Sequence, residues 1–238
     1  MTPELLVAPD ASALIEMLAA RLVLTARQSI EARGAFSLAL SGGSTPRALY
    51  QKLASPEWKS QIDWSKCDIV FGDDRAVAPD DSLSNYRMAK ESLLDHVDAR
   101  VHRIQTEAAD LDAAAADYET VLRGLGGRLD VVLLGLGDDG HTASLFPGSP
   151  QLNVKDKWVT ATPVASLEPH VRRVTLTFEC INAARNAWFL VTGAGKVARV
   201  HDVLRGSRNL DLWPAQGVDL QSGETVWFLD QAAASNLD

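Results

Sequence analysis

Apolar residues follow two alternating patterns along the chain, and the first is the spacing of a helix. Leucines recur at every fourth position on one face of residues 12–33: Leu14, Leu18 and Leu22. Asp10 and Ser12 are residue types that cap helix starts, and Gly34 is the type that ends helices. A long first helix is therefore predicted. Directly after it, the short, mostly apolar segment Phe36–Leu40 predicts a buried strand.

The same alternation continues through the rest of the chain. Further strands are predicted over residues 68–71, 101–104, 129–136, 158–164, 173–178, 187–192 and 225–229. Further helices are predicted over residues 46–53, 111–122 and 195–204. Another is expected to begin with a cap within residues 80–84 and to end near residue 97. Repeated strand–loop–helix units predict an α/β fold with a mostly parallel central sheet. The sequence has no repeat or linker, so residues 1–238 are expected to form a single domain.

Composition and charge are those of a globular protein without a membrane span. Hydrophobic residues make up 46% of the chain and charged residues 23%, and the formal net charge is −8. The longest unbroken apolar run is residues 187–191, whereas a spanning helix needs about 20 residues. A negatively charged surface repels nucleic-acid phosphates, so nucleic-acid binding is not expected. A small anionic substrate stays compatible with this charge, because a local pocket of amides and cations overrides the average field.

The cellular location is predicted from the cysteines and from the first residues. Cys67 and Cys180 are the two cysteines, and both adjoin strand-like runs, which indicates buried thiols rather than a disulfide framework. The first basic residue is Arg21, so no charged segment precedes an apolar signal sequence. A cytoplasmic location is therefore expected.

Loops that follow strands carry the candidate chemistry, because ligands of parallel α/β sheets bind beyond the carboxyl ends of the strands. The first such loop is Ser41-Gly42-Gly43-Ser44-Thr45-Pro46. Its glycines allow close approach of the backbone, and its hydroxyls and free amides offer donors to an anion. Thr45 is expected to cap the next helix, with Pro46 at the first helical position. The loop lacks the lysine of a Walker loop. It is interpreted as a phosphate site, with an ordinary capped turn as the alternative.

A second loop, Gly72-Asp73-Asp74-Arg75, follows the strand predicted at residues 68–71. Adjacent carboxylates repel each other unless one is protonated or paired, and Arg75 is available for pairing. A solvated charged turn is the alternative interpretation. Further on, Ser84 and Asn85 are expected to open a helix, where simple capping is sufficient to explain them.

The third loop, residues 135–142 (GLGDDGHT), follows the most apolar predicted strand. Its glycines match a dinucleotide-binding pattern, but its two carboxylates oppose a pyrophosphate and Pro147 interrupts the helix that would bind one. The loop instead presents His141 beside Asp138 and Asp139. A carboxylate fixes the tautomer of an imidazole and raises its basicity, which suits a general base. One histidine among scattered acids lacks the spacing of a metal site, so no metal is expected.

Two further cation sites complete the candidate set. Arg172 and Arg173 begin an alternating strand, so one of them is expected to face the ligand edge of the sheet. Residues 193–196 (GAGK), which end in Lys196, follow another strand and open a helix, and this suits an anion. Either site alone is equally compatible with a surface charge. Together with residues 41–46, called the glycine-rich loop below, they favour a phosphorylated small molecule as the ligand.

These loops resemble those of the 6-phosphogluconolactonases. The resemblance rests on residues 41–46, 73–75, 84–85, 135–148 (GLGDDGHTASLFPG), 173–177 (RVTLT) and 193–196. The family usually has Asp-Glu-Arg where this chain has Asp73-Asp74-Arg75, a change that keeps the charge and shortens one side chain. The resemblance implies a Rossmann-like three-layer fold shared with glucosamine-6-phosphate deaminases. It also implies hydrolysis of 6-phospho-D-glucono-1,5-lactone to 6-phosphogluconate without metal or organic cofactor.

The resemblance also implies a role for individual residues. His141 would be the general base, Asp139 its partner, and Arg75 would lie near the lactone as a third catalytic residue. The implied substrate-binding set is Gly42, Gly43, Ser44, Thr45, Asp73, Asn85, Arg173 and Lys196. The expected partner is a small sugar phosphate, with no nucleic acid and no membrane, and the chain is expected to be a monomer or a weak homo-oligomer.

Two alternative functions fit the same fold. Glucosamine-6-phosphate deaminase/isomerases carry an additional glutamate after the histidine motif, where this chain has Phe146, a side chain that cannot exchange protons. A non-catalytic sugar-phosphate sensor needs an output segment, usually a DNA-binding helix-turn-helix, and the chain has no spare segment for one. Lactone hydrolysis is therefore the favoured interpretation.

Overall fold

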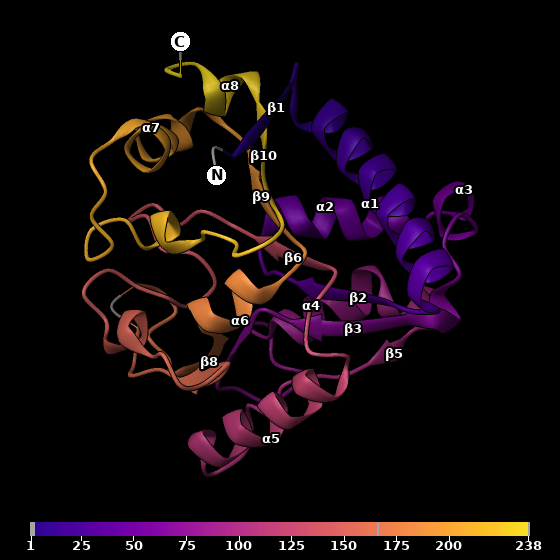
Figure 1. Ribbon diagram of the computed structural model, residues 1–238, viewed down its shortest axis with the longest axis horizontal. Helices are drawn as coiled ribbons and strands as arrows, with labels where there is room; N and C mark the ends of the chain where they lie inside the picture. The colour runs from indigo at the N-terminus through magenta and orange to yellow at the C-terminus, as the bar shows by residue number, and fades with distance from the viewer. Residues whose placement is uncertain (1–2, 166, 238) are drawn as a thin grey trace.

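Seven parallel strands form a central sheet within residues 3–165 and 167–237, which the computed structural model describes (Figure 1). The strands lie in the order β1-β10-β9-β6-β2-β3-β5. Their bounds are β1 (Glu4–Ala8), β2 (Phe36–Leu40), β3 (Cys67–Phe71), β5 (Arg100–Val101), β6 (Val131–Leu134), β9 (Asn186–Val191) and β10 (Glu224–Asp230). The chain runs outward through β3 and β5 on one side and through β9 and β10 on the other. The predicted mostly parallel α/β fold is thus confirmed.

A second sheet of three antiparallel strands lies at the carboxyl end of β3. Its strands are β4 (Asp73–Arg75), β8 (Arg173–Leu176) and β7 (Val159–Ala161), in that order. The helices are α1 (Ala11–Arg33), α2 (Ser44–Ala54), α3 (Pro56–Lys59), α4 (Asn85–Ser92), α5 (Leu111–Gly124), α6 (Phe178–Ala183), α7 (Val197–Arg205) and α8 (Gln231–Ala234). Among these described helices, none is long and apolar enough to cross a membrane.

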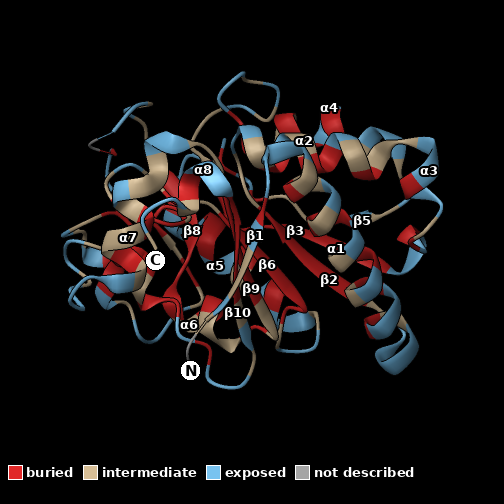
Figure 2. Ribbon diagram, turned by 90° about the horizontal axis from the view of Figure 1, so that it is seen from above, coloured by how far each residue is buried: buried red, intermediate tan, exposed pale blue. Residues whose placement is uncertain are grey.

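The inner strands of the central sheet, β9, β6, β2 and β3, are buried on both faces. Successive residues of a strand point to opposite faces, so Trp188 and Phe189 of β9 lie on different sides of the sheet. Trp188 contacts Phe228 of β10 edge-on at 5.5 Å between ring centroids, and Phe189 stacks on Trp227 at 4.0 Å. All four rings are buried, and Figure 2 shows the buried strands inside helices whose outer surfaces are exposed. This explains why these strands have continuous apolar runs.

Local signals place the first helix correctly. The Asp10 side chain accepts a hydrogen bond from the Ala13 N–H at 2.9 Å, which caps α1. Gly34 ends the helix in the left-handed conformation (φ +79°), and its N–H donates to the Ile30 carbonyl at 2.8 Å. Cys67 and Cys180 are buried and free, as predicted from their surroundings.

Several predicted boundaries are wrong. The second helix begins at Ser44 with Gly43 as its cap, so Pro46 lies inside the first turn, where a missing N–H costs no hydrogen bond. Helix α4 ends at Ser92 rather than near residue 97, because the fully buried Leu93 leaves the helical conformation (φ −141°). A short 3-10 turn, Leu94–His96, follows it.

The strand predictions fail mainly at the edges of the sheets. The strand expected at residues 101–104 is reduced to β5, which has a neighbour on one side only. The segments at 158–164 and 173–178 form shorter strands of the second, antiparallel sheet rather than of the central one. The loop at residues 72–75 contains β4, and β1, α6 and α8 were not predicted. These elements are short, and the two strands among them, β1 and β4, exist through pairing with β10 and β8.

Candidate active site

The loops after β2 and β6 meet where the central sheet changes its winding direction. A Cβ atom built on Gly135 would lie 3.9 Å from the hydroxyl oxygen of Ser41, so the two loops are direct neighbours. The loop after β9 joins them, because the hydroxyl oxygens of Thr45 and Thr192 are 2.9 Å apart. Doubly wound sheets bind ligands at this point. The structure therefore brings together three loops that the sequence marks separately.

His141 and Asp139 form a direct pair in the loop after β6. The imidazole Nδ1 lies 2.6 Å from Asp139 Oδ1, and the backbone N–H of His141 donates to the same oxygen at 3.0 Å. Burial works to raise the pKa of the Asp139 carboxyl, but the hydrogen bonds and charge of His141 outweigh it and lower that pKa. An ionised carboxylate at Nδ1 leaves Nε2 as the nitrogen that accepts a proton. The histidine side chain is 21% exposed, so water can reach it.

Two glycines give this loop its shape. Gly140 adopts a positive φ of +86°, and its N–H donates to the Gly137 carbonyl at 3.1 Å. Any side chain on Gly137 would collide with the imidazole of His141. The Gly137 N–H also donates to the His141 carbonyl at 2.9 Å, which closes the turn. The glycines that mimic a dinucleotide motif thus serve to fold the loop around its histidine.

The Phe146 ring lies between the histidine and an arginine of the second sheet. Its centroid is 4.6 Å from that of the His141 ring and 5.1 Å from the Arg173 guanidinium carbon. In the sequence, Phe146 stands out only because it occupies the position where the deaminases have a glutamate. In the structure its buried ring fills the space between the base and the cation.

Arg75 and Arg173 lie opposite each other in the pairing of β4 and β8. Arg173 is 4% exposed, and the buried Nε atoms of both arginines have no hydrogen-bond partner in the described part of the chain. The hydrogen bonds that their side chains do make go to carbonyls, of Leu83 for Arg75 at 2.5 Å and of Pro169 for Arg173 at 3.4 Å. Burial lowers the pKa of Arg173, against the opposite effect of Asp73. Two guanidinium groups with spare donors favour an anionic ligand here.

Asp73, two residues before Arg75 on β4, belongs to a hydrogen-bonded cluster. The Ser144 hydroxyl donates to Asp73 Oδ2 at 2.5 Å, and the Asn85 side-chain amide donates to the other carboxylate oxygen at 3.3 Å and to the Asp73 carbonyl at 3.0 Å. Gly42 makes room for Asn85, since a Cβ there would collide with the amide. The cluster joins three predicted residues to Ser144, which was not predicted. A serine three residues after the histidine gives no distinctive signal.

Asp74 has a different environment from its neighbour. It is 1% exposed and accepts hydrogen bonds from the backbone N–H groups of Arg75, Asn85 and Tyr86 and from the Ser84 hydroxyl, at 2.6–3.1 Å. Burial raises its pKa, and the backbone hydrogen bonds act against this. The carboxylate holds the start of α4 against β4. This is a structural role, and the shorter aspartate performs it.

A cavity of about 410 Å³ lies beside the glycine-rich loop. Gly43, Ser44, Arg75 and Asn85 line it, all of which the sequence marks, and Arg47 lines it as well. Arg47 is exposed in the first turn of α2, and its side chain makes no hydrogen bond or ion pair with any described residue. The sequence analysis missed it. Arg47 follows Ser44 by three residues, and this helical spacing places the two on the same face of α2. That spacing is the sequence signal that would have predicted it.

Lys196, in the segment after β9, binds two oxygens of the loop that carries His141. Its ammonium group donates to the Leu136 carbonyl at 2.8 Å and to the Asp138 carboxylate at 2.5 Å. The Asp138 side chain is 85% exposed, so this ion pair is easily exchanged for another anion. Lys196 thus links the loop after β9, to which it belongs, to the loop that carries His141.

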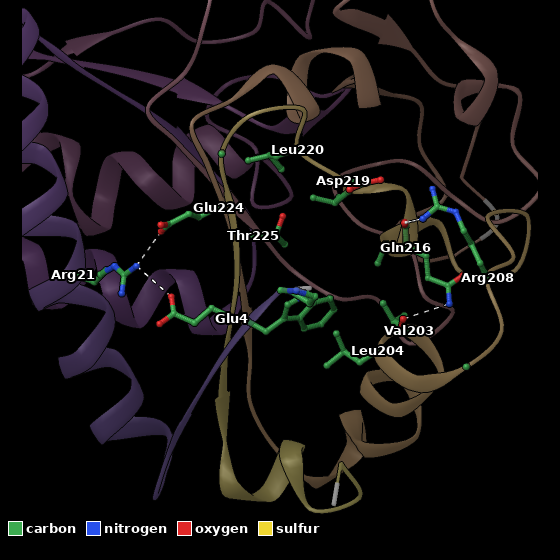
Figure 3. A pocket seen from close by; sticks show the side chains of 16 residues that line it. Glu4, Arg21, Val203, Leu204, Arg208, Gln216, Asp219, Leu220, Glu224 and Thr225 are labelled. Carbon is green, nitrogen blue, oxygen red and sulfur yellow. Dashed lines mark hydrogen bonds and ion pairs between the residues drawn. The ribbon is translucent and has the colours of Figure 1, made fainter. Parts of the chain in front are cut away.

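A second, larger cavity lies outside the set of predicted site residues. It measures about 710 Å³ and opens beside Glu4 and Glu224, the first residues of β1 and β10 (Figure 3). Arg21 bridges the two glutamates at 3.2 and 3.3 Å. The amino ends of the strands are the wrong edge for a ligand in this fold. None of the predicted site residues lines this cavity.

Metal ligands are not clustered in the structure. Within residues 3–165 and 167–237, no group of three or more His, Cys, Asp or Glu side chains is arranged to hold a metal ion. His102, for example, is bound to Asp68 at 2.9 Å, which Arg100 also contacts. The absence of a cofactor stays a prediction from the sequence.

Comparison with known protein families gives one match that spans most of the chain. Residues 9–227 match the model of "Glucosamine-6-phosphate isomerases/6-phosphogluconolactonase". A 6-phosphogluconolactonase of Synechocystis is 38% identical, with 100% of this chain and 99% of that protein covered. A probable chloroplastic 6-phosphogluconolactonase 4 of Oryza sativa is 40% identical over 90% of this chain and 70% of its own length.

Solved structures resemble the chain over its whole length. The 6-phosphogluconolactonase of Trypanosoma cruzi superimposes with a TM-score of 0.89 at 29% identity, covering 100% of this chain and 98% of that one. A monomeric glucosamine-6-phosphate deaminase superimposes with a TM-score of 0.85 at 22% identity, over 98% and 99% of the two chains. The latter likeness shows the shared fold alone.

Proposed function

Because the chain belongs to the family of glucosamine-6-phosphate isomerases and 6-phosphogluconolactonases, we infer that it hydrolyses 6-phospho-D-glucono-1,5-lactone to 6-phospho-D-gluconate. This is the reaction of a carboxylic ester hydrolase in the oxidative pentose phosphate pathway. The observation that carries the mechanism is the His141–Asp139 pair, held at 2.6 Å at the ligand edge of the sheet. Ester hydrolysis needs an activated water, and this pair is built to accept its proton.

His141 acts as the general base in this proposal. Its Nε2 takes a proton from a water molecule while the water oxygen attacks the lactone carbonyl carbon. The tetrahedral oxyanion then collapses, the bond to the ring oxygen breaks, and the imidazolium returns its proton to that oxygen. One water is consumed, and His141 ends in its starting state. Asp139 stabilises the imidazolium between the two steps and keeps the ring oriented.

The cations of the site hold the substrate. We assign Gly42, Gly43, Ser44, Thr45, Arg173 and Lys196 to the 6-phosphate, with Asp73 and Asn85 behind them. The support is the pair of buried Nε atoms of Arg75 and Arg173, which have no hydrogen-bond partner among the described residues, and the exchangeable contact of Lys196 with Asp138. Arg75 would lie near the lactone, where a guanidinium offsets the charge of the oxyanion. Arg47, whose side chain pairs with no residue in the described part of the chain, adds a cation at the cavity beside the glycine-rich loop.

Phe146 argues against the deaminase reaction. Ring opening and isomerisation of an amino sugar require a further group that moves protons, and here an apolar ring packs 4.6 Å from the histidine. A sensor without catalytic activity has no use for a histidine paired with an ionised carboxylate. Lactone hydrolysis is the function that the geometry supports best.

The proposal extends to the cellular setting. The two buried free thiols support a cytoplasmic location. A monomer or weak homo-oligomer stays the expectation from the sequence. The net charge of −8 supports the absence of nucleic-acid binding.

Two assays on the purified protein test this function. Freshly prepared phosphorylated lactone is added at constant pH, and acid release is followed against the spontaneous rate. Glucosamine 6-phosphate is added to a second sample, and ammonia is followed. Acid release well above the spontaneous rate without ammonia is expected. Ammonia release, or acid release at the spontaneous rate, would contradict the proposal.

A further inference from the structure

The His141–Asp139 pair lies within a single loop, so it does not by itself fix where the imidazole stands in the site. The contacts that close the loop, from Gly137 to His141 and from Gly140 to Gly137, are also internal. Hydrogen bonds within a loop fix its shape, but they do not fix its position relative to the rest of the protein. The distance from the base to Arg173 and the substrate must therefore be set by groups outside the loop.

Besides Lys196, which contacts Leu136 and Asp138, groups of α7 and of the segment after it hold the loop on either side of Asp139. The Arg199 Nε of α7 donates to the carbonyl of Asp138 at 2.9 Å. On the other side, the Ala215 N–H donates to the carbonyl of Gly140 at 3.0 Å. The Trp213 ring packs on Gly140 so closely that a Cβ at this glycine would lie 2.8 Å from ring atom Cε3. Asp139 is thus fixed between a hydrogen bond before it and a packed aromatic ring after it.

Arg199 and Trp213 also hold each other. The guanidinium carbon of Arg199 lies 4.3 Å from the centre of the Trp213 ring, and its Nη1 donates to the Asp202 carboxylate at 2.7 Å, one turn along α7. A planar guanidinium that is stacked and paired in this way loses little freedom when it binds the loop. The helix therefore supplies a rigid support for the loop.

We propose that Arg199 and Trp213 are positioning residues that hold Asp139, and through it the His141 imidazole, in place for catalysis. The inference rests on the proposed function. Arg199 contacts the loop at Asp138 and Trp213 contacts it at Gly140, and among the described contacts neither residue touches the His141 ring. Their loss is expected to lower kcat and to leave substrate binding nearly unchanged, because misplacing a base by about 1 Å costs up to about a hundredfold in rate.

Four variants test the proposal in the lactonase assay. Arg199→Met keeps the length of the side chain but removes the donor and the charge. Trp213→Ala removes the ring, and Trp213→Phe restores an aromatic surface against Gly140. Arg205→Met is the matched control, since Arg205 ends the same helix, is exposed, and its side chain hydrogen-bonds only to the Leu237 carbonyl, at 3.4 Å, among the described residues. The fraction of folded protein is measured for each variant by circular dichroism and thermal unfolding.

Arg199→Met and Trp213→Ala are expected to lower kcat per folded molecule about ten- to hundredfold, with KM within about twofold of the wild-type value. Trp213→Phe should recover most of the loss, and Arg205→Met should behave as wild type. Folded Arg199→Met and Trp213→Ala proteins with wild-type kcat would overturn the inference, as would a large rise in KM at unchanged kcat. A wild-type protein that does not hydrolyse the lactone would overturn the proposed function itself.

Discussion

Arg75 and Arg173 stand opposite each other across β4 and β8, with one buried Nε each that lacks a partner in the described residues. Like charges at such close quarters are unfavourable unless an anion joins them. Asp73 supplies part of this charge, but its oxygens already accept hydrogen bonds from Ser144 and Asn85. The remaining donors are the strongest indication in the structure that the substrate is anionic.

Arg173→Met is therefore expected to raise KM about ten- to hundredfold, because one charge-assisted contact contributes about 1.5–3 kcal/mol. The fall in kcat should be smaller, since a phosphate contact acts similarly on substrate and transition state. Arg172→Met is the matched control, because Arg172 is the exposed neighbour and donates to the Thr162 carbonyl. Steady-state kinetics measure both values. An unchanged KM in a folded Arg173→Met protein would remove Arg173 from the binding site.

Asp74 is predicted to matter for stability. Asp74→Ala removes the acceptor of four hydrogen bonds at the start of α4 and should lower the free energy of unfolding by about 2–4 kcal/mol. Denaturant unfolding measures this, with Asp80→Ala as an exposed control that should change it by less than about 0.5 kcal/mol. If both variants were equally stable, the structural role given to Asp74 would be wrong.

Asp68 gives a prediction about pH. Burial works to raise the pKa of its carboxyl, but the hydrogen bonds from Arg100 and His102 outweigh it and lower that pKa. A carboxyl with a depressed folded-state pKa contributes stability that is complete above the unfolded-state value of about 3.9 and is lost as pH falls through the folded-state value.

Asp68→Asn should accordingly lower Tm near neutral pH, and the difference from wild type should shrink below about pH 4. Asp117→Asn, an exposed change on α5, should leave Tm unchanged at every pH. Thermal unfolding across the pH range checks this. A Tm difference that stayed constant down to acid pH would show that ionisation of Asp68 is not its source.

A chelator is expected to leave the hydrolysis rate unchanged. His141 and Asp139 supply the base that the reaction needs, and the described residues contain no cluster of metal-ligating side chains. Protein incubated with chelator and then desalted is assayed beside untreated protein. Activity that is lost on chelation and returns with a divalent metal would contradict a mechanism based on the histidine alone.

Much of the fold follows from local sequence signals. The first helix is bounded by Asp10 and Gly34, and β2 coincides with the mostly apolar segment Phe36–Leu40. Such elements are fixed by capping and by burial on both faces, which a single sequence records. By contrast, β4 is three residues long, two of them acidic, and exists because β8 pairs with it. No local preference predicts a strand of that composition.

The candidate site divides in the same way. The loops with glycines, acids and His141 are visible because those residue types are unusual directly after strands. Arg47, Ser144 and Arg199 were missed because an arginine on a helix or a serine in a loop is ordinary in sequence. Their significance depends on what the fold places next to them: a cavity, Asp73 and the Asp138 carbonyl respectively.

The most direct test of the proposed mechanism is kcat of His141→Asn, measured per folded molecule. The account predicts a fall of about 10²–10⁴ with KM near the wild-type value, because the base acts on water and not on the phosphate. Asp139→Asn should also lower kcat, since it removes the ionised partner of Nδ1. His201→Asn, on the surface of α7, should keep full activity. A folded His141→Asn protein with wild-type kcat would contradict the mechanism.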